Sequence, residues 1–234
     1  MWKKGIHHGD VSLGNLMWDD RRKVGVLNDF DRARFGDQRG ASGQDNAGTL
    51  PFMALDLLSV RGLHGEIPRR YRHEAESFTW CLICLYFATV EDEGGENRTR
   101  HPHPLFEWFQ GWKRSRNAKL GLQWHDEDIG RVRLAHPNTR DLARALHKYW
   151  VGRYKKQFPD ASARKDPSVL AGAFDIGDSE EETEGLPYEE PEDHRVFQRL
   201  LVKHEKELNV ERLQEIRENL VKVGLKCREI DWNA

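Results

Sequence analysis

His8-Gly9-Asp10-Val11-Ser12-Leu13-Gly14-Asn15 and Asn28-Asp29-Phe30-Asp31 are the two stretches that decide how this chain of 234 residues is interpreted. The first places a histidine two residues before an aspartate, and an asparagine five residues after that aspartate. The second places two aspartates at the end of a short apolar run. Transfer of a phosphoryl group from ATP needs a loop that carries a base and a metal ligand, followed by a second metal ligand. The ordered pair of stretches therefore predicts phosphoryl-transfer chemistry.

Two short apolar runs, Leu16–Trp18 and Val24–Leu27, lie between these stretches and are joined by the polar residues 19–23. Short runs rich in apolar and β-branched residues around a polar turn predict a β-hairpin. Such a hairpin would fix Asn15 before its first strand and Asp29 after its second.

Three residues of the two stretches are candidates for the chemistry itself. Phosphoryl transfer depends mainly on positioning and on neutralisation of charge. Asp10 is the candidate that accepts or orients the proton of the attacking hydroxyl. Asn15 and Asp29 are candidate Mg²⁺ ligands, because Mg²⁺ prefers a few carboxylate or amide oxygens together with phosphate and water.

The chain after Asp29 is polar and rich in glycine up to about Gly48, and this pattern predicts a functional or mobile loop. Apolar residues then return at helical spacing, which predicts a short helix from about Met53. Residues 73–87 are apolar almost all round from residue 78, as in a helix buried in the middle of a domain. Its early carboxylates, Glu74 and Glu76, are either solvated groups that suit the helix dipole or inward contacts. We favour an inward contact to the catalytic loop for Glu74.

Two further helices are predicted over residues 105–122 and from 138 to about 158 by their apolar spacing. Residues 159–194 contain an acidic run flanked by glycine and proline, and this composition predicts a disordered linker. Residues 195–223 carry two apolar stripes at helical spacing and predict an amphipathic helical tail, which packs back on the domain or binds a partner.

Composition excludes several classes of protein. Hydrophobic residues make up 38% of the chain and charged residues 32%, and the net charge of −2 gives no global field that attracts nucleic acid or an anionic membrane. No apolar run approaches the roughly 20 residues that span a bilayer, and the N-terminus lacks the apolar region of a signal peptide. We therefore expect a cytoplasmic or nuclear chain. Cys81 and Cys84 lie in the apolar helical run and are predicted to be buried and reduced.

Three segments together resemble the fungal-type protein kinase family, a branch of the protein-kinase-like superfamily. Residues 8–15 resemble its His-Arg-Asp-x-Ser-x-Gly-Asn catalytic loop. Residues 48–54, Gly-Thr-Leu-Pro-Phe-Met-Ala, are similar to its Gly-Thr-x-Pro-Phe-Met-Ala, which ends the activation segment. Residues 73–80, His-Glu-Ala-Glu-Ser-Phe-Thr-Trp, resemble its His-Asp-x-Glu-Ser-Phe-x-Trp at the start of the central helix.

The resemblance implies a mainly α fold with a small β-hairpin (α+β), the C-terminal large lobe of the protein-kinase-like fold over residues 1–158. Within it the catalytic loop would be 8–15, the activation segment 29–56 and the central helix 73–87. The glycine-rich loop, the strand lysine and the helical glutamate of the N-terminal small lobe are not found in the sequence. We therefore expect a large lobe alone, which is inactive without its small lobe.

The resemblance also implies a function and a set of roles. The activity would be ATP-dependent phosphorylation of serine or threonine in a protein substrate, with ATP and Mg²⁺ as cofactors. Asp10 would be the catalytic base, and Asn15 and Asp29 would hold magnesium. Supporting roles would fall to His8 within the catalytic loop, to Thr49 in the platform for the substrate, and to Glu74 at the position whose side chain hydrogen-bonds the catalytic-loop backbone.

Four positions depart from the family pattern. Gly9 replaces the arginine that pairs with a phosphorylated activation loop, so we expect no switching by that route. Ser12 stands in place of the lysine that contacts the transferred phosphate, and is a candidate for part of that role. Asp31 replaces the glycine of Asp-Phe-Gly, and Asp56 replaces the glutamate that closes the segment.

Two other functions are compatible with these residues. The first is a non-catalytic, pseudokinase-like binding or scaffold protein that keeps the fold of the lobe, which the missing small lobe favours. The second is a small-molecule kinase of the aminoglycoside or choline type, in which His-Gly-Asp is also found. Residues 48–54 argue against the second, because such enzymes lack this platform for a protein substrate.

Overall fold

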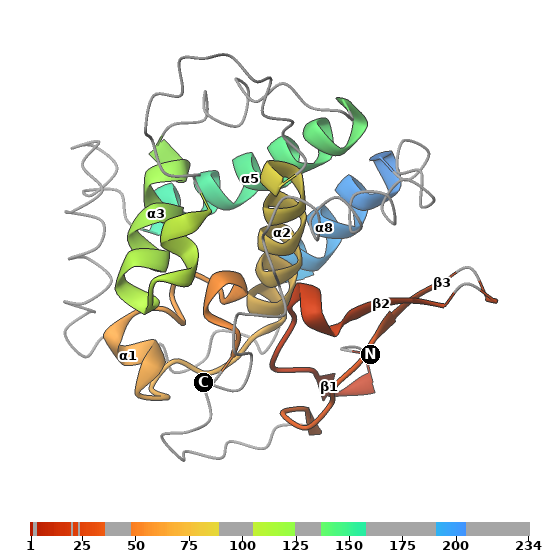
Figure 1. The fold of residues 1–234 in the computed structure, drawn as a ribbon, viewed down its shortest axis with the longest axis horizontal. Coiled ribbons are helices and arrows are strands. Elements are labelled where there is room, and N and C mark those ends of the chain that lie inside the picture. The colour runs from red at the N-terminus through yellow and green to blue at the C-terminus, as the bar shows by residue number, and fades with distance from the viewer. Residues whose placement is uncertain are drawn as a thin grey trace.

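The computed structural model describes residues 1, 4–19, 21–22, 24–35, 48–88, 105–124, 137–157 and 191–204. These residues form a mainly helical structure with two small antiparallel strand pairs, which confirms the predicted mainly α class with a β-hairpin (Figure 1). No helix among them is long and apolar enough to cross a membrane.

The predicted hairpin is present. Strand β2, Leu16–Asp19, pairs with β3, Val24–Leu27, in an antiparallel register that places Leu16 opposite Leu27. It projects from the helical part of the molecule in Figure 1. The ladder places the residues before β2 beside the residues after β3.

A second strand pair corrects the expectation of a loop from Asp29 to Gly48. Strand β4, Arg34–Phe35, pairs antiparallel with β1, Ile6–His7. A ladder of two residues is too short to show an alternating pattern, so the sequence carried no signal for it. Residues 36–47 of the predicted loop lie outside the described residues.

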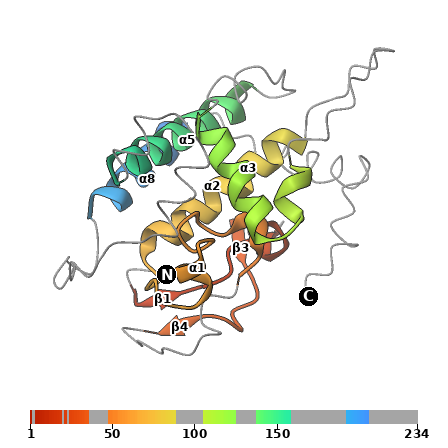
Figure 2. The same ribbon diagram turned by 90° about the vertical axis from the view of Figure 1, so that its left-hand side faces the viewer.

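The predicted central helix is α2, Tyr71–Ala88, and the other long helices surround it (Figures 1 and 2). It packs against α5, Pro137–Gln157, and α8, Pro191–His204, and α3, Trp112–Trp124, lies on the other side. The core holds large aromatic side chains from several elements. The fully buried ones are Phe52, Trp80, Trp108, Trp150 and Tyr154, and Cys81 and Cys84 lie buried among them, as predicted.

The helix predicted from Met53 is not formed. The chain makes a 3₁₀ turn η3, Leu50–Phe52, and its regular helix α1 spans only Val60–Leu63, after Ser59. Backbone groups of this segment are hydrogen-bonded to side chains of the core. The Leu55 N–H donates to a carboxylate on α2, and the Met53 carbonyl accepts from an ammonium on α3. Tertiary contacts therefore override the local helical spacing.

The helix predicted over 105–122 is divided. A 3₁₀ turn η4, Phe106–Phe109, precedes α3, and the break falls at Gly111, whose φ is +96°. A positive φ suits glycine and interrupts a right-handed helix. The division lets Trp108 enter the core while Trp112 starts the next helix.

The C-terminal helix begins earlier than expected. Helix α8 starts at Pro191, inside the range 159–194 that was predicted to be a disordered linker, and proline is well suited to the first turn of a helix. Phe197 is buried against the core. Residues 159–190 of the predicted linker and 205–223 of the predicted tail lie outside the described residues.

Candidate active site

His8 links the two stretches that first suggested the chemistry. Its ring is fully buried, its Nδ1 accepts from the Asp10 N–H at 3.2 Å, and its Nε2 lies 2.8 Å from the Asn28 carbonyl oxygen. Because Nδ1 is the acceptor and a carbonyl cannot donate, Nε2 must carry the proton. The ring also meets Phe30 edge to face, with centroids 4.8 Å apart. His8 therefore joins the loop 8–15 to the residues around Asp29.

Asp10 is held by a segment 39 residues further along the chain. Its Oδ1 accepts from both the Thr49 N–H and the Thr49 hydroxyl, each at 2.8 Å. Its Oδ2 lies 4.0 Å from Nε of Arg32. Two donors on one oxygen fix the orientation of the carboxylate and leave Oδ2 facing a half-exposed guanidinium.

Asn15 and Asp29 are brought to the same end of the hairpin. The Asn28 N–H donates to the Asn15 carbonyl at 2.8 Å, which extends the β2–β3 ladder by one pair. The Asn15 side-chain N–H₂ donates to the Asp10 carbonyl at 2.8 Å, so its amide oxygen is the atom left for a cation. Asp29 is exposed and has φ +61°, a left-handed conformation that side chains other than Asn and Asp rarely adopt.

These two oxygen donors fit Mg²⁺ in its usual nucleotide-bound form. Mg²⁺ is commonly held by one or two protein oxygens, with phosphate and water filling the other positions. A dedicated site of three or more His, Cys, Asp or Glu side chains does not occur in the part of the chain that the structure describes. The chemistry of the donors therefore suits a cation that arrives with a phosphate.

Glu74 makes the inward contact that the sequence favoured. Its Oε1 accepts from the Gly9 N–H at 2.9 Å, in a buried hydrogen bond between α2 and the catalytic loop. Burial raises the pKa of Glu74, and the Gly9 hydrogen bond and Arg69 act in the opposite direction. Gly9 has φ +81°, and a Cβ there would lie 2.7 Å from the Arg32 carbonyl oxygen. The loop therefore requires glycine at this position.

The position of Ser12 does not suit its predicted contact with the transferred phosphate. Its side chain is 1% exposed, and its carbonyl accepts from the Asn15 N–H at 3.1 Å within the turn 13–15. A buried hydroxyl does not reach out as the lysine of the family pattern would. The expected contact of Ser12 with the transferred phosphate is thus not supported by its position.

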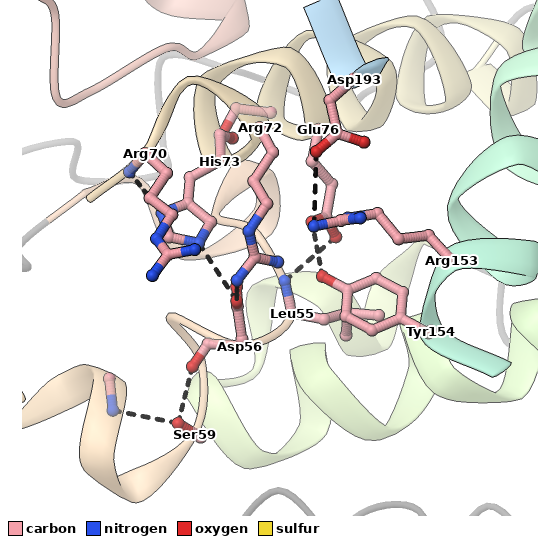
Figure 3. Close-up of polar contacts among 12 residues, drawn as sticks. Leu55, Asp56, Ser59, Arg70, Arg72, His73, Glu76, Arg153, Tyr154 and Asp193 are labelled. Atoms are coloured by element: carbon pink, nitrogen blue, oxygen red, sulfur yellow. Dashed lines mark hydrogen bonds and ion pairs between the residues drawn. The ribbon is translucent and has the colours of Figure 1, made fainter. Parts of the chain in front are cut away.

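A buried ion pair below the substrate platform was not found from the sequence. Asp56 Oδ2 lies 2.6 Å from Arg72 Nη2 and 3.1 Å from His73 Nε2 (Figure 3). The Arg70 N–H donates to His73 Nδ1 at 3.0 Å, so the ring is neutral with its proton on Nε2. Burial raises the pKa of Asp56, but Arg72 and His73 outweigh this effect and hold it well below its usual range. Burial lowers the pKa of His73 to about 4, against the opposing effect of Asp56.

Glu76 forms the second part of this buried network (Figure 3). Its Oε1 accepts from the Leu55 N–H at 3.1 Å and from Trp80 Nε1 at 3.0 Å, and its Oε2 accepts from the Tyr154 hydroxyl at 2.6 Å. Burial, followed by the charge of Asp56, raises the pKa of Glu76 to about 7. Glu76 thereby joins the segment after η3 to helices α2 and α5.

Lys119 attaches helix α3 to the segment that follows η3. Its ammonium is fully buried, donates to the Met53 carbonyl at 2.7 Å, and lies 5.0 Å and 5.4 Å from the ring centroids of Trp80 and Trp108. Burial lowers the pKa of Lys119 to about 7, with Glu76 acting in the opposite direction. The sequence shows Glu76 near the start of an apolar helix, but it carries no signal for the burial of Lys119 on the polar helix α3.

Comparison with known proteins agrees with the resemblance seen in the sequence. Residues 1–86 match the model of a family described as fungal protein kinase. These residues include all three segments on which the resemblance rests, and the predicted family is therefore confirmed over this range. No curated protein and no solved structure matches the chain.

Proposed function

Because residues 1–86 match the model of the fungal protein kinase family, we propose that the chain is the catalytic and substrate lobe of an ATP-dependent kinase that acts on serine or threonine in proteins. The family supports a kinase-like phosphotransferase in general. The choice of acceptor and the roles of individual residues belong to the proposal.

The observation that carries the proposal is the contact between Asp10 and Thr49. It joins the candidate base to the segment 48–54, which in the family ends the activation segment. An acceptor hydroxyl placed beside Oδ2 of Asp10 would lie next to that segment. A backbone strand of a protein substrate would then be positioned by the platform, and the geometry favours a protein acceptor over a small alcohol.

Each proposed role corresponds to a group whose surroundings suit it. Asp10 would accept or orient the proton of the acceptor hydroxyl from a carboxylate that Thr49 holds in one orientation. Asn15 and Asp29 would hold Mg²⁺, which neutralises charge on the phosphates of ATP when it is bound. His8 and Glu74 would position the loop through Asn28 and Gly9.

The test is phosphoryl transfer from radiolabelled ATP to a mixed library of Ser and Thr peptides, in a version joined to the small lobe of a fungal protein kinase. We expect Asp10→Asn to lower the rate of transfer by about 10²–10⁴-fold, because a positioned base contributes about that much. Asp29→Asn should weaken the dependence of transfer on Mg²⁺. Asp31→Asn is the matched control, since Asp31 belongs to the same stretch but has no proposed role.

Three outcomes separate the proposal from the other functions. Full transfer by Asp10→Asn would exclude Asp10 as the base. Binding of protein partners with no binding of Mg-ATP in the joined version would indicate a scaffold. Transfer to small alcohols in preference to all peptides would indicate a small-molecule kinase.

A further inference from the structure

Three arginines gather around Asp10 from two parts of the chain. Arg32 brings its Nε to 4.0 Å from Asp10 Oδ2, and its carbonyl lies against Gly9. Arg34 stands on β4, opposite His7 of β1. Arg69 lies just before α2, with its Nη2 3.5 Å from the position that a Cβ on Gly48 would take. Arg32 therefore lies beside the carboxylate that would receive the acceptor hydroxyl, and Arg69 lies against the start of the segment 48–54.

Arg69 lies among groups of both charges. Burial lowers the pKa of Arg69 to about 10, with Glu74 and Asp10 acting in the opposite direction and Arg34 and Arg32 acting in the same direction as burial. Arg69 thus stays charged at neutral pH beside two other guanidinium groups. Each carboxylate already accepts hydrogen bonds from the backbone. An anion that entered beside Arg32 would relieve the repulsion among the arginines.

The geometry also explains why an arginine at position 9 is absent. The space that a side chain at residue 9 would need is occupied by the backbone of Arg32. Arg32 therefore brings a guanidinium to the catalytic loop from a different segment. Its side chain is 50% exposed, so a ligand can reach it from solvent.

On these grounds, and resting on the proposed function, we infer that Arg32, with Arg34 and Arg69 behind it, selects acceptor peptides that carry a phosphorylated or acidic residue beside the Ser or Thr. The fork of a guanidinium matches a phosphate or carboxylate in geometry, and clusters of arginines are a common means of recognising such motifs. The chain as a whole has a net charge of −2, so it does not attract anionic peptides by its global field. A preference for them must come from a local site.

The experiment measures binding, not transfer, by fluorescence anisotropy of labelled peptides with the full chain. Each pair of peptides shares one acceptor serine and differs only at a neighbouring position, which is phosphoserine or glutamate in one peptide and glutamine in the other. We expect the phosphoserine peptide to bind about tenfold more tightly than its glutamine partner, since charge-assisted hydrogen bonds to a guanidinium are stronger than neutral ones. The preference should weaken as salt is raised.

Variants locate the site. Arg32→Gln should abolish most of the preference, and Arg32→Lys should restore only part of it, because lysine keeps the charge but loses the fork. Arg114→Gln is the matched control. Arg114 is 61% exposed and has a single carboxylate neighbour, Glu107 at 3.8 Å, on the distant helix α3. Far-ultraviolet circular dichroism of each variant checks that the fold is kept.

The outcomes distinguish this inference from the proposed function. Equal affinity for the paired peptides, or a preference that Arg32→Gln leaves unchanged, would overturn the inference even if transfer occurs. A preference that depends on Arg32, in a chain that transfers no phosphate when joined to a small lobe, would count against the proposed function and support recognition of the anion.

Discussion

The two halves of the candidate site differ in how they are held. On the platform side, every residue from Pro51 to Ser59 is buried, and three helices contribute charged or aromatic groups to the segment. On the hairpin side, the large apolar residues Met17, Val24 and Val26 are 39–47% exposed. The acceptor side is therefore fixed by the core, whereas the metal side depends on a two-stranded ladder and a few hydrogen bonds.

The difference separates the residues that stabilise the whole fold from the residues that set the local geometry of the site. Hydrogen bonds and ion pairs removed from water are strong and costly to break, while those at an exposed hairpin contribute little. A change below the platform should therefore act on the whole fold. A change at the hairpin or the catalytic loop should act mainly on the local geometry.

Breaking the buried ion pair between Asp56 and Arg72 should have the largest effect on the free energy of unfolding. Arg72→Met should lower the free energy of unfolding by about 3–5 kcal/mol, because it leaves the Asp56 carboxylate buried with only the neutral His73 as a partner. Urea denaturation followed by circular dichroism measures the change.

The hairpin offers a matched control. Arg22→Met removes an arginine that pairs with Asp19 at 3.7 Å and is 81% exposed. The free energy of unfolding should change by no more than about 0.5 kcal/mol. Equal losses in the two variants would contradict the division between a buried platform and an exposed hairpin.

The pH dependence of stability sharpens the comparison on the platform side. Burial raises the pKa of Glu76 from 4.5 to about 7, so folding favours its neutral form. The contribution of Glu76 is fully present below pH 4.5 and is lost as the pH rises through about 7. Glu76→Gln, which keeps an acceptor for Leu55, should become more stable relative to the natural protein over this range, by about 2–3 kcal/mol.

Denaturation of both proteins at several pH values between 4.5 and 7.5 gives this difference directly. His73 titrates in both proteins and drops out of the comparison. Lys119 does not drop out, because the charge of Glu76 raises its pKa, so part of the pH dependence belongs to the Glu76–Lys119 pair. A difference that stays constant with pH would mean that Glu76 is ionised throughout, and would contradict the raised pKa.

A substitution in the catalytic loop should have the smallest of the three effects on the free energy of unfolding. Gly9→Ala should lower the free energy of unfolding by about 1–2 kcal/mol, because alanine resists a φ of +81° and its Cβ would meet the Arg32 carbonyl oxygen. The loop, and with it the contact from Asp10 to Thr49, should be displaced. Loss of the Gly9–Glu74 hydrogen bond would appear as faster exchange of the Gly9 amide hydrogen in the related variant Glu74→Ala, which removes the acceptor.

Gly25→Ala is the control for this variant. Gly25 lies in β3, and nothing stands within 4 Å of the position of its Cβ. The free energy of unfolding should change little or rise slightly, since alanine loses less backbone entropy than glycine. If Gly25→Ala lowered the free energy of unfolding as much as Gly9→Ala, the close approach of Arg32 would not explain the requirement for glycine at position 9.

Several parts of the fold could be predicted from the sequence because their signals are local. The hairpin β2–β3 has two apolar runs around a polar turn, and α2 and α5 have long helical patterns. The loop 8–15 could be recognised because its residues are spaced as the chemistry requires. The contact from Glu74 to Gly9 followed from the resemblance to the family.

Other parts depend on contacts that no local pattern shows. The helix expected from Met53 fails because the Met53 carbonyl, which a helix would pair with the Leu57 N–H, accepts instead from Lys119, a residue 66 positions away. The role of Tyr154 follows from a hydrogen bond across 78 positions. Ser12 was assigned a role from its place in a motif, and only its burial shows that the hydroxyl faces the interior.

The backbone of Asp29 has a consequence for evolution and for engineering. A non-glycine residue with φ +61° costs about 1–2 kcal/mol relative to an ordinary conformation, and glycine would remove that cost. Asp29→Gly should therefore make the protein more stable while deleting a candidate magnesium ligand. If the lobe had no use for a carboxylate here, selection for stability alone would favour glycine. Under the proposed function, stability and chemistry make opposite demands on Asp29.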